Sequence, residues 1–338
     1  MLLRQRPHAG TLIKTVAIVG GTHGNERAGI HLIKLFDKNP ELVSRPSFNT
    51  TCLISNVDAV KADTRYVSED LNRCFDTKYL DLAKRTMERH SEMRRCLEVN
   101  SILGPKEAPK TDFVVDIHNT TANTGILLCF HKTDTFASQV SAYLKLFHPE
   151  IVTVFWAQAD PPFLPSVGKS GMTMEIGPVA HSTINSKIFH KTKELISLTL
   201  DYVELHNKLA LDPDTIDVEK LVVNMKVAER VAEIDYPRDK DGFLSAFIHS
   251  SLQGISELKD GSTVKQGSPI FISALGETIH LDLFQIHKNN PDVDPEEQYF
   301  PMFVNEAAYY EKGVAFILTR LKDYKITTLR KSSISSKV

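Results

Sequence analysis

Short runs of apolar, β-branched residues in the first two hundred positions constrain the fold more than any other feature of this sequence. The clearest are residues 15–20 (TVAIVG), 113–117 (FVVDI) and 172–176 (MTMEI). Runs that are apolar on both faces are typical of strands buried in a parallel sheet. Between them, residues 26–35 and 186–209 carry apolar side chains at helical spacing. This alternation predicts an α/β fold, a mixed sheet flanked by helices.

Further elements follow the same reasoning. Residues 50–56, 125–131 and 152–156 are predicted strands. A charged segment at residues 80–103, closed by Gly104-Pro105, predicts a single helix.

The texture of the chain changes after residue 211. Turn pairs such as Asp241-Gly242 become frequent, with short apolar runs between them, which favours β-hairpins. The length of 338 residues exceeds the ~100–200 residues of a typical domain. We therefore predict one domain at residues 1–210 and a second, β-rich domain at residues 211–338. The Ser- and Lys-rich end, from Arg330, is expected to be frayed.

Composition excludes several classes of function. A net charge of −2 gives no general attraction to nucleic acid or to an anionic membrane. No apolar run approaches the roughly 18 residues of a membrane span. The first ten residues lack the apolar core of a secretory signal. The four cysteines form no CxxC pair, which indicates reduced thiols in a cytoplasmic protein.

Polar side chains of the metal-ligand type stand where three predicted strands end. His23 and Glu26 follow the first strand, His118 follows the second, and Glu175 lies near the end of the third. Sites in open α/β sheets form outside the carboxyl ends of the strands, so these residues are expected to converge. Two imidazoles and one carboxylate suit a catalytic zinc, which leaves a fourth position for water. Asp116, two residues before His118, would face the same side and could accept its second ring proton.

An HxxE pair alone has little specificity, because a histidine in such a loop is often a surface or core residue. The metal interpretation gains from context: both histidines stand at strand ends, and glycines flank the first. Such glycines allow a tight turn and a close approach of a ligand.

Ordered motifs along the chain carry a family resemblance. They are GGTHGNE at residues 20–26, DLNR at 70–73, DIHNTTANTG at 116–125, YPRDKDG at 236–242 and NEAAYYEK at 305–312. With these motifs the chain resembles the aspartoacylase family, part of the wider zinc carboxypeptidase-like group, over nearly its whole length. The resemblance implies a zinc carboxypeptidase-like catalytic domain and a β-rich C-terminal domain that caps the active site.

The resemblance also assigns roles. It implies one Zn²⁺ per subunit, held by His23, Glu26 and His118. Relatives are often dimers, so a homodimer is expected, with a small N-acyl amino acid as the only other partner.

Further roles come from the same resemblance. Glu175 matches the catalytic glutamate, a general base that takes a proton from water and returns it to the departing amine. Arg65 matches the arginine that stabilises the oxyanion. Asn72 and Arg73 match the substrate-binding pair, to which Arg65 and Glu175 also contribute, and an arginine fork suits a carboxylate. Tyr309 matches a residue that reaches the substrate from the C-terminal part.

The substrate is less well defined than the reaction. Relatives that favour N-acetyl-L-aspartate carry two further cations, and the matching positions here are Pro165 and Glu233. Lys169, four residues past Pro165, could replace one of them. Relatives that act on N-acyl aromatic amino acids also lack the first cation and share HNTTANTG. The sequence therefore leaves open N-acetyl-L-aspartate and N-acyl aromatic or other neutral amino acids.

Other hypotheses remain beside the two deacylases. The wider family includes desuccinylases of acyl amino acids. A zinc-binding module without catalysis would carry the same ligands but turn over no substrate. A nucleotide-binding protein is disfavoured, because GGTHGNE is neither GxGxxG nor GxxxxGK[ST].

Overall fold

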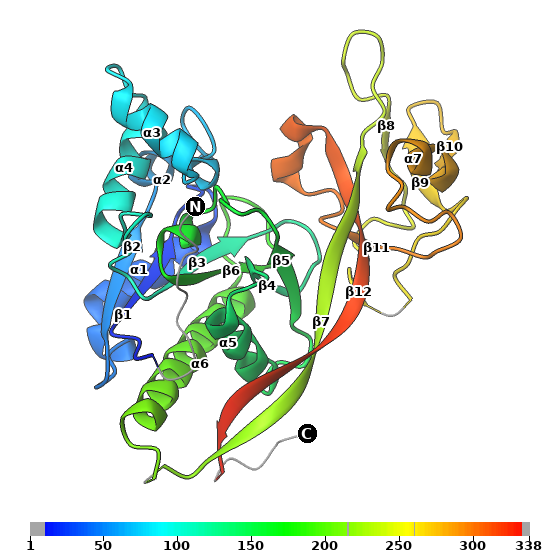
Figure 1. The fold of residues 1–338 in the computed structure, drawn as a ribbon. Coiled ribbons are helices and arrows are strands. Elements are labelled where there is room, and N and C mark those ends of the chain that lie inside the picture. Colours follow the sequence, from blue (N-terminus) through cyan, green and yellow to red (C-terminus); the bar gives the residue numbers. More distant parts are fainter. Residues whose placement is uncertain (1–10, 215, 260, 333–338) are drawn as a thin grey trace.

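The computed structural model describes residues 11–214, 216–259 and 261–332 (Figure 1). The expectation that the first ten residues form no secretory signal lies outside the described residues, as does the tail from residue 333.

Strands and helices alternate through the first two thirds of the chain, as predicted. The strands are β1 (Thr15–Gly20), β2 (Asn49–Ile54), β3 (Phe113–Asn119), β4 (Ile126–His131), β5 (Val152–Trp156), β6 (Ser170–Ile176), β7 (Val218–Asp235), β8 (Ala246–Ile248), β9 (Pro269–Ser273), β10 (Thr278–His280), β11 (Phe300–Met302) and β12 (Val314–Lys331). The α-helices are α1 (Arg27–Lys38), α2 (Val57–Ala62), α3 (Thr77–Arg85), α4 (Ser91–Leu103), α5 (Thr135–Lys145), α6 (Ser186–Leu211) and α7 (Leu283–Asn289). Short 3-10 helices are η1 (Pro40–Leu42), η2 (Leu71–Arg73), η3 (Leu164–Val167) and η4 (Ala307–Lys312).

A mixed nine-stranded sheet forms the centre of the molecule, in the order β11-β12-β7-β5-β4-β6-β3-β1-β2. Strands β1, β2, β3 and β6 are parallel to one another, whereas β4 is antiparallel to β6 and parallel to β5. The predicted mixed α/β sheet is confirmed. Helices α1, α5 and α6 pack on one face, and α3 and α4 pack on the other (Figure 1).

Burial on both faces explains the continuous apolar runs. In β1, Val16 and Ile18 join the core under α1, α5 and α6, while Ala17 and Val19 join the core under α3 and α4. Each alternate residue of such a strand faces a different layer of helices, so both sets must be apolar.

The C-terminal part is built around two strands of 18 residues each, β7 and β12. They pair along their length as a twisted antiparallel ribbon, and one stretch of β7 pairs with β5 of the central sheet (Figure 1). Beyond the sheet, the ribbon packs on the small sheet β10-β9-β8 and on α7. The predicted β-rich C-terminal domain is confirmed, and the boundary at residues 210 and 211 stays a prediction.

Two local predictions were wrong. Residues 80–103 form two helices instead of one, because the side chain of His90 accepts the backbone N–H of Met93 and starts α4 as a new helix. The chain is not frayed at Arg330, which lies in β12 with its guanidinium paired to Glu219 of β7. A charged pair across the ribbon therefore holds this end of β12.

The described helices and cysteines add two plain findings. Even α6, with 26 residues, lacks the apolar character of a membrane-crossing helix, and so do the other described helices. All four cysteines are free thiols, as predicted.

Candidate active site

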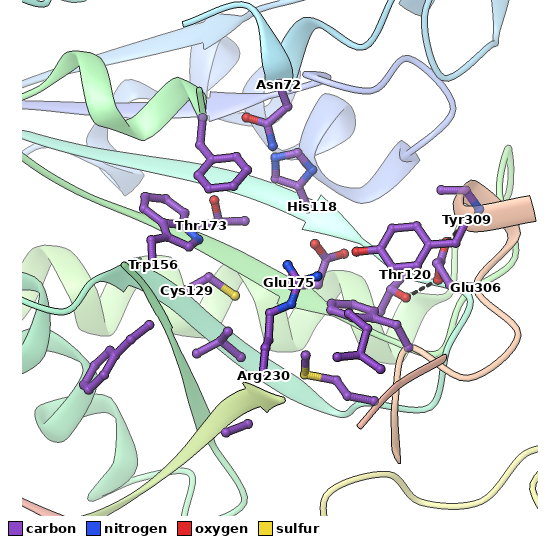
Figure 2. Close-up of a pocket in the computed structure, with 18 of the residues that line it drawn as sticks. Asn72, His118, Thr120, Cys129, Trp156, Thr173, Glu175, Arg230, Glu306 and Tyr309 are labelled. Atoms are coloured by element: carbon purple, nitrogen blue, oxygen red, sulfur yellow. Dashed lines mark hydrogen bonds between the residues drawn. The ribbon is translucent and has the colours of Figure 1, made fainter. Parts of the chain in front are cut away.

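A cavity of about 1070 Å³ opens where β1, β3 and β6 end. Its floor is one face of the central sheet, and side chains of successive strands line it, from Glu175 on β6 through Cys129 on β4 and Val154 on β5 to Ala228 on β7. Figure 2 shows the lining residues, with Tyr309 of the C-terminal part facing Glu175.

The turn after β1 is shaped by glycine. Gly21 has a positive φ of 70°, which favours a residue without a Cβ. A Cβ on Gly24 would lie 2.1 Å from the carbonyl carbon of Ala59, so only glycine fits there. The backbone N–H of Gly24 donates to the carbonyl of Arg65, at 3.2 Å. The turn therefore lies directly against the segment that carries the predicted substrate-binding residues.

His23, Glu26 and His118 come together as the sequence predicted. Nδ1 of His23 lies 2.5 Å from Glu26 Oε1 and 3.1 Å from Nδ1 of His118, which lies 3.1 Å from Glu26 Oε2. The three ligand atoms lie within 4.8 Å of one another, and all three side chains are buried. The two imidazoles thus present the same ring nitrogen to one point beside a carboxylate, which is the donor set of a catalytic zinc site.

The outer nitrogen of each imidazole is held by an aspartate. Nε2 of His118 lies 2.7 Å from Asp116, as predicted, and Asp116 also accepts the hydroxyl of Thr22. Nε2 of His23 lies 3.1 Å from Asp70. A carboxylate on the outer nitrogen fixes the tautomer that leaves Nδ1 free to bind a metal.

The charged groups of this cluster shift one another's pKa values. Burial raises the pKa of Glu26, but the imidazoles of His23 and His118 lower it well below its usual range. Burial lowers the pKa of His118, but Asp116 and Glu26 raise it well above its usual range. Metal ligands bind in their deprotonated forms, so binding of a divalent cation at this cluster would be coupled to the protonation of its side chains.

Glu175 lies beside His118 in neighbouring strands, so their side chains share a face of the sheet. Within the described residues its carboxylate makes no hydrogen bond or ion pair, and it opens into the cavity (Figure 2). Burial, and then the charge of Glu26, raise its pKa to about 8. A carboxyl group in a cavity whose pKa lies near neutral pH is suited to act as a general base and a general acid.

Arg65 reaches the same cluster from the loop before η2. Its two terminal nitrogens lie 3.4 Å from Glu26 and 3.2 Å from Asp70. Its Nε is buried and has no hydrogen-bond partner among residues 11–332 that the structure describes. Arg65 lines the cavity, and its role at the oxyanion stays a prediction.

Asn72 and Arg73 are held by the loop before η3. The side-chain oxygen of Asn72 accepts the backbone N–H of Leu164, at 2.9 Å, which leaves the amide nitrogen for the cavity. The guanidinium of Arg73 lies 5.1 Å from the ring centre of Phe163. The buried ammonium of Lys106 donates to carbonyls on both sides of this contact, those of Phe75 and Pro161.

Tyr309 and Glu306 connect the C-terminal part to the site. Burial raises the pKa of Tyr309 to about 12, so its hydroxyl stays a hydrogen-bond donor at neutral pH. Glu306 is buried and accepts the hydroxyl of Thr120 and the backbone N–H groups of Thr121 and Ala122. Burial raises its pKa, but His181 and Thr120 lower it to about 2.

The positions discussed for substrate charge lie outside the cavity. Pro165 is buried in η3, Glu233 is half-exposed on β7, and neither lines the cavity. Lys169 does not replace a cation there, since its ammonium pairs with Asp112 at 2.6 Å. A different cation does line the cavity: Arg230, three residues before Glu233 and paired with it.

The cavity wall beyond the catalytic residues is aromatic. Trp156 and Phe163 both line it, with ring centres 4.7 Å apart. Such a wall suits an apolar or aromatic group of a substrate.

Sequence reasoning missed Asp70, Glu306 and Arg230 as site residues. Asp70 and Glu306 stand inside the motifs DLNR and NEAAYYEK, so the motifs themselves were the available signal. Arg230 stands in no motif, and only the pairing of β7 with β5 brings it to the cavity.

The comparisons with known proteins agree with this geometry. The chain matches the succinylglutamate desuccinylase/aspartoacylase catalytic domain over residues 12–203. It matches the AstE/AspA barrel-sandwich hybrid domain over residues 224–321.

Individual relatives are similar over almost the whole chain. A protein named "Probable aspartoacylase" from Trichodesmium erythraeum is 36% identical, over 93% of this chain and 99% of its own length. The human N-acyl-aromatic-L-amino acid amidohydrolase (carboxylate-forming) is 34% identical, over 91% and 90%. The crystal structure of murine aminoacylase 3 superposes with a TM-score of 0.82 at 30% identity, covering 95% of this chain and 99% of that one.

Proposed function

Because the chain belongs to the succinylglutamate desuccinylase/aspartoacylase family, we propose that it is a zinc-dependent amidohydrolase that removes the acyl group from N-acyl amino acids. The observation that carries this proposal is the convergence of His23, Glu26 and His118 beside the free carboxylate of Glu175.

The donor set fits zinc. Both Nδ1 atoms and the carboxylate of Glu26 face one point, and Asp70 and Asp116 hold the outer nitrogens. Zinc bound there would polarise the substrate carbonyl and lower the pKa of a water molecule to roughly 7.

Glu175 moves the proton. Its carboxylate takes a proton from the attacking water and then gives it to the amide nitrogen as the C–N bond breaks. The products are the free amino acid and the carboxylate of the acyl group. Burial raises the pKa of Glu175 to about 8, and a group with a pKa near the working pH can both take up a proton and give it back.

Arginines hold the substrate and its developing charge. The guanidinium of Arg65, which lines the cavity, donates to the carbonyl oxygen as that oxygen gains negative charge. Arg73 and the amide nitrogen of Asn72 hold the α-carboxylate, and Tyr309 donates from the opposite side. Contacts that strengthen as the oxyanion forms raise the rate, whereas those to the carboxylate set the affinity.

Two substrates are supported by different observations. N-acetyl-L-aspartate, giving aspartate and acetate, is supported by the similarity to the Trichodesmium protein. N-acyl aromatic amino acids are supported by the wall of Trp156 and Phe163 and by the similarity to the human amidohydrolase. We place N-acetyl-L-aspartate first.

A substrate panel tests the proposal. Purified protein is loaded with zinc and assayed with N-acetyl-L-aspartate, N-acetyl-L-tyrosine and N-succinyl-L-glutamate. Turnover is expected with at least one, and it should be abolished by a chelator and restored by zinc. Zinc binding without turnover of any N-acyl amino acid would instead identify a non-catalytic zinc-binding module.

We further propose a cytoplasmic homodimer. Four free thiols suit a reducing compartment. Light scattering on the purified chain tests the dimer, and a single-chain mass would contradict it.

A further inference from the structure

Arg230 is a cation in the cavity that the proposed reaction does not use. It follows Ala228 at alternate spacing on β7, and Ala228 pairs with Val154 on the cavity floor. Alternate residues of a strand share a face, so Arg230 points the same way. Figure 2 shows its side chain extending from β7 into the cavity, toward Glu175.

The charge of Arg230 acts inside the cavity. Burial raises the pKa of Cys129, and Arg230 counteracts it from the neighbouring side of the floor. The pKa of Tyr309, raised by burial, is lowered by Arg73, Arg230 and Arg65. The charge of Arg230, like those of Arg65 and Arg73, therefore acts on a hydroxyl that lines the cavity.

The ion pair between Arg230 and Glu233 is weak. Glu233 lies outside the cavity lining, and both side chains of the pair are 49% exposed. Exposed pairs of this kind contribute little, so a carboxylate inside the cavity can compete for the guanidinium. The other nearby carboxylate, Glu229, is already engaged by Lys322 at 2.6 Å and by the hydroxyl of Tyr324 at 2.9 Å.

The position of Arg230 defines what it can reach. Strand β7 is separated from β6 by β5 and β4, which places the β7 backbone about 14 Å from Glu175 across the sheet. Arg65, beside Glu26 and Asp70, lies at the metal end of the cavity. Arg230 therefore meets a group of the substrate that lies away from the metal end.

We propose that Arg230 forms a second anion subsite, which selects N-acyl amino acids that carry a second carboxylate. Pro165 and Glu233 stand where relatives that favour N-acetyl-L-aspartate carry cations, and Arg230 supplies a cation from another position of the chain. This inference rests on the proposed function. The second carboxylate can belong to the amino acid side chain or to the acyl group, and the guanidinium fork binds either in the same way.

Matched substrate pairs test the subsite. N-acetyl-aspartate is compared with N-acetyl-asparagine, which differs only in the side-chain charge, and N-succinyl-alanine is compared with N-butanoyl-alanine. For Arg230→Met we expect kcat/KM to fall roughly 10- to 100-fold for the dicarboxylate that uses the subsite and to stay within about twofold for its neutral partner. The pair that responds identifies the source of the carboxylate.

Two further variants provide controls. Glu233→Gln removes the competing carboxylate and should raise kcat/KM for the same dicarboxylate about two- to fivefold, without affecting the neutral substrate. It keeps the inference testable if Arg230→Met fails to fold. Arg330→Gln, at the opposite end of the same ribbon, should leave all four substrates unchanged.

The results that overturn the inference are distinct from failure of the proposed function. Equal losses for charged and neutral substrates in Arg230→Met, or no charge preference in the wild type, would exclude the subsite. If wild-type protein with zinc hydrolyses none of the four, nor N-acetyl-L-tyrosine or N-succinyl-L-glutamate, the proposed function fails. Binding of the same compounds to Glu175→Gln, measured by calorimetry, then tests Arg230 separately. Tighter binding of the dicarboxylate that is lost on adding Arg230→Met supports the subsite. Equal binding of charged and neutral compounds to Glu175→Gln overturns it.

Discussion

The two ends of the cavity are built in different ways. At the metal end, formed by His23, Glu26 and His118, every residue is at most 3% exposed and its side chain has at least two polar partners. At the outer end, formed by Trp156, Phe163 and Arg230, contacts are aromatic or half-exposed, and Arg230 is 49% exposed.

This difference separates chemistry from selectivity. Buried polar groups with several partners hold one geometry, because moving any of them leaves another unsatisfied. Half-exposed groups tolerate replacement at little cost in stability. Substitutions at the metal end should therefore abolish the reaction, whereas those at the outer end should change which substrate is used.

The largest effect is expected for Glu175→Gln. Loss of the general base should reduce kcat roughly 10²- to 10⁴-fold, because amide cannot accept the proton from water. Zinc content should be unchanged, since Glu175 is not among the clustered donors. Glu219→Gln, which changes a carboxylate of β7 that is paired with Arg330 and lies outside the cavity lining, serves as the control. A Glu175→Gln enzyme within tenfold of the wild-type kcat would remove Glu175 from the mechanism.

The next effect separates the two aspartates of the metal end. Asp70→Asn and Asp116→Asn should each weaken zinc binding roughly 10- to 100-fold, measured by competition with a chromophoric chelator. At saturating zinc, only Asp70→Asn should also lower kcat, because Asp70 holds Arg65 as well as His23. Wild-type zinc affinity in both variants would show that the imidazoles do not need these carboxylates.

Glu306→Gln should have an intermediate effect, on stability. The carboxylate accepts the hydroxyl of Thr120 and several backbone N–H groups across the two parts of the chain, and charged hydrogen bonds of this kind contribute about 1.5–3 kcal/mol each. We expect a loss of that order in the free energy of unfolding at neutral pH, measured with urea.

The pH dependence of the same variant gives a second measurement. The pKa of Glu306 in the folded chain is about 2, below the roughly 4.3 of an unfolded chain. Its stabilisation is complete above the unfolded pKa and is lost as pH falls toward 2. The difference between wild type and Glu306→Gln should therefore narrow between pH 4 and pH 2, and a difference that widens would contradict this sign.

The smallest effect is expected at the outer end. Phe163→Leu removes the ring under Arg73, a contact worth about 0.5–1 kcal/mol when exposed. KM should rise about two- to fivefold with kcat unchanged, because the arginine holds the substrate equally before and during the reaction. A loss confined to kcat would instead connect Phe163 with the transition state.

Much of the metal end could be predicted from local sequence. His23 and Glu26 lie within one turn, and His118 and Asp116 lie on one strand, so their relation needs only the geometry of a turn and of a strand. Glu175, like His118, stands near the end of a predicted strand, so the sequence predicted that they converge, and the structure adds that they pair in register. Asp70 could not be placed, because its contact with His23 depends on the path of a loop 47 residues away.

The outer end shows the opposite case. The side chains of β7 alternate between its two faces, and the sequence does not tell which face points to the cavity. A shift of one residue in the pairing register would turn Arg230 away from the cavity. The pairing of Val154 with Ala228 determines that face, and it joins strands far apart in sequence. The split of residues 80–103 into two helices likewise depends on a side-chain cap that apolar spacing does not reveal.

For this protein the sequence alone determined the buried strands, the glycine turn after the first of them and the donors that follow it, because each depends on neighbours a few residues away. Only the tertiary structure decided that Asp70 supports His23, that Glu306 joins the C-terminal part to the loop after β3, and that Arg230 enters the cavity. These contacts depend on strand register and loop path, which are set by the packing of the whole chain.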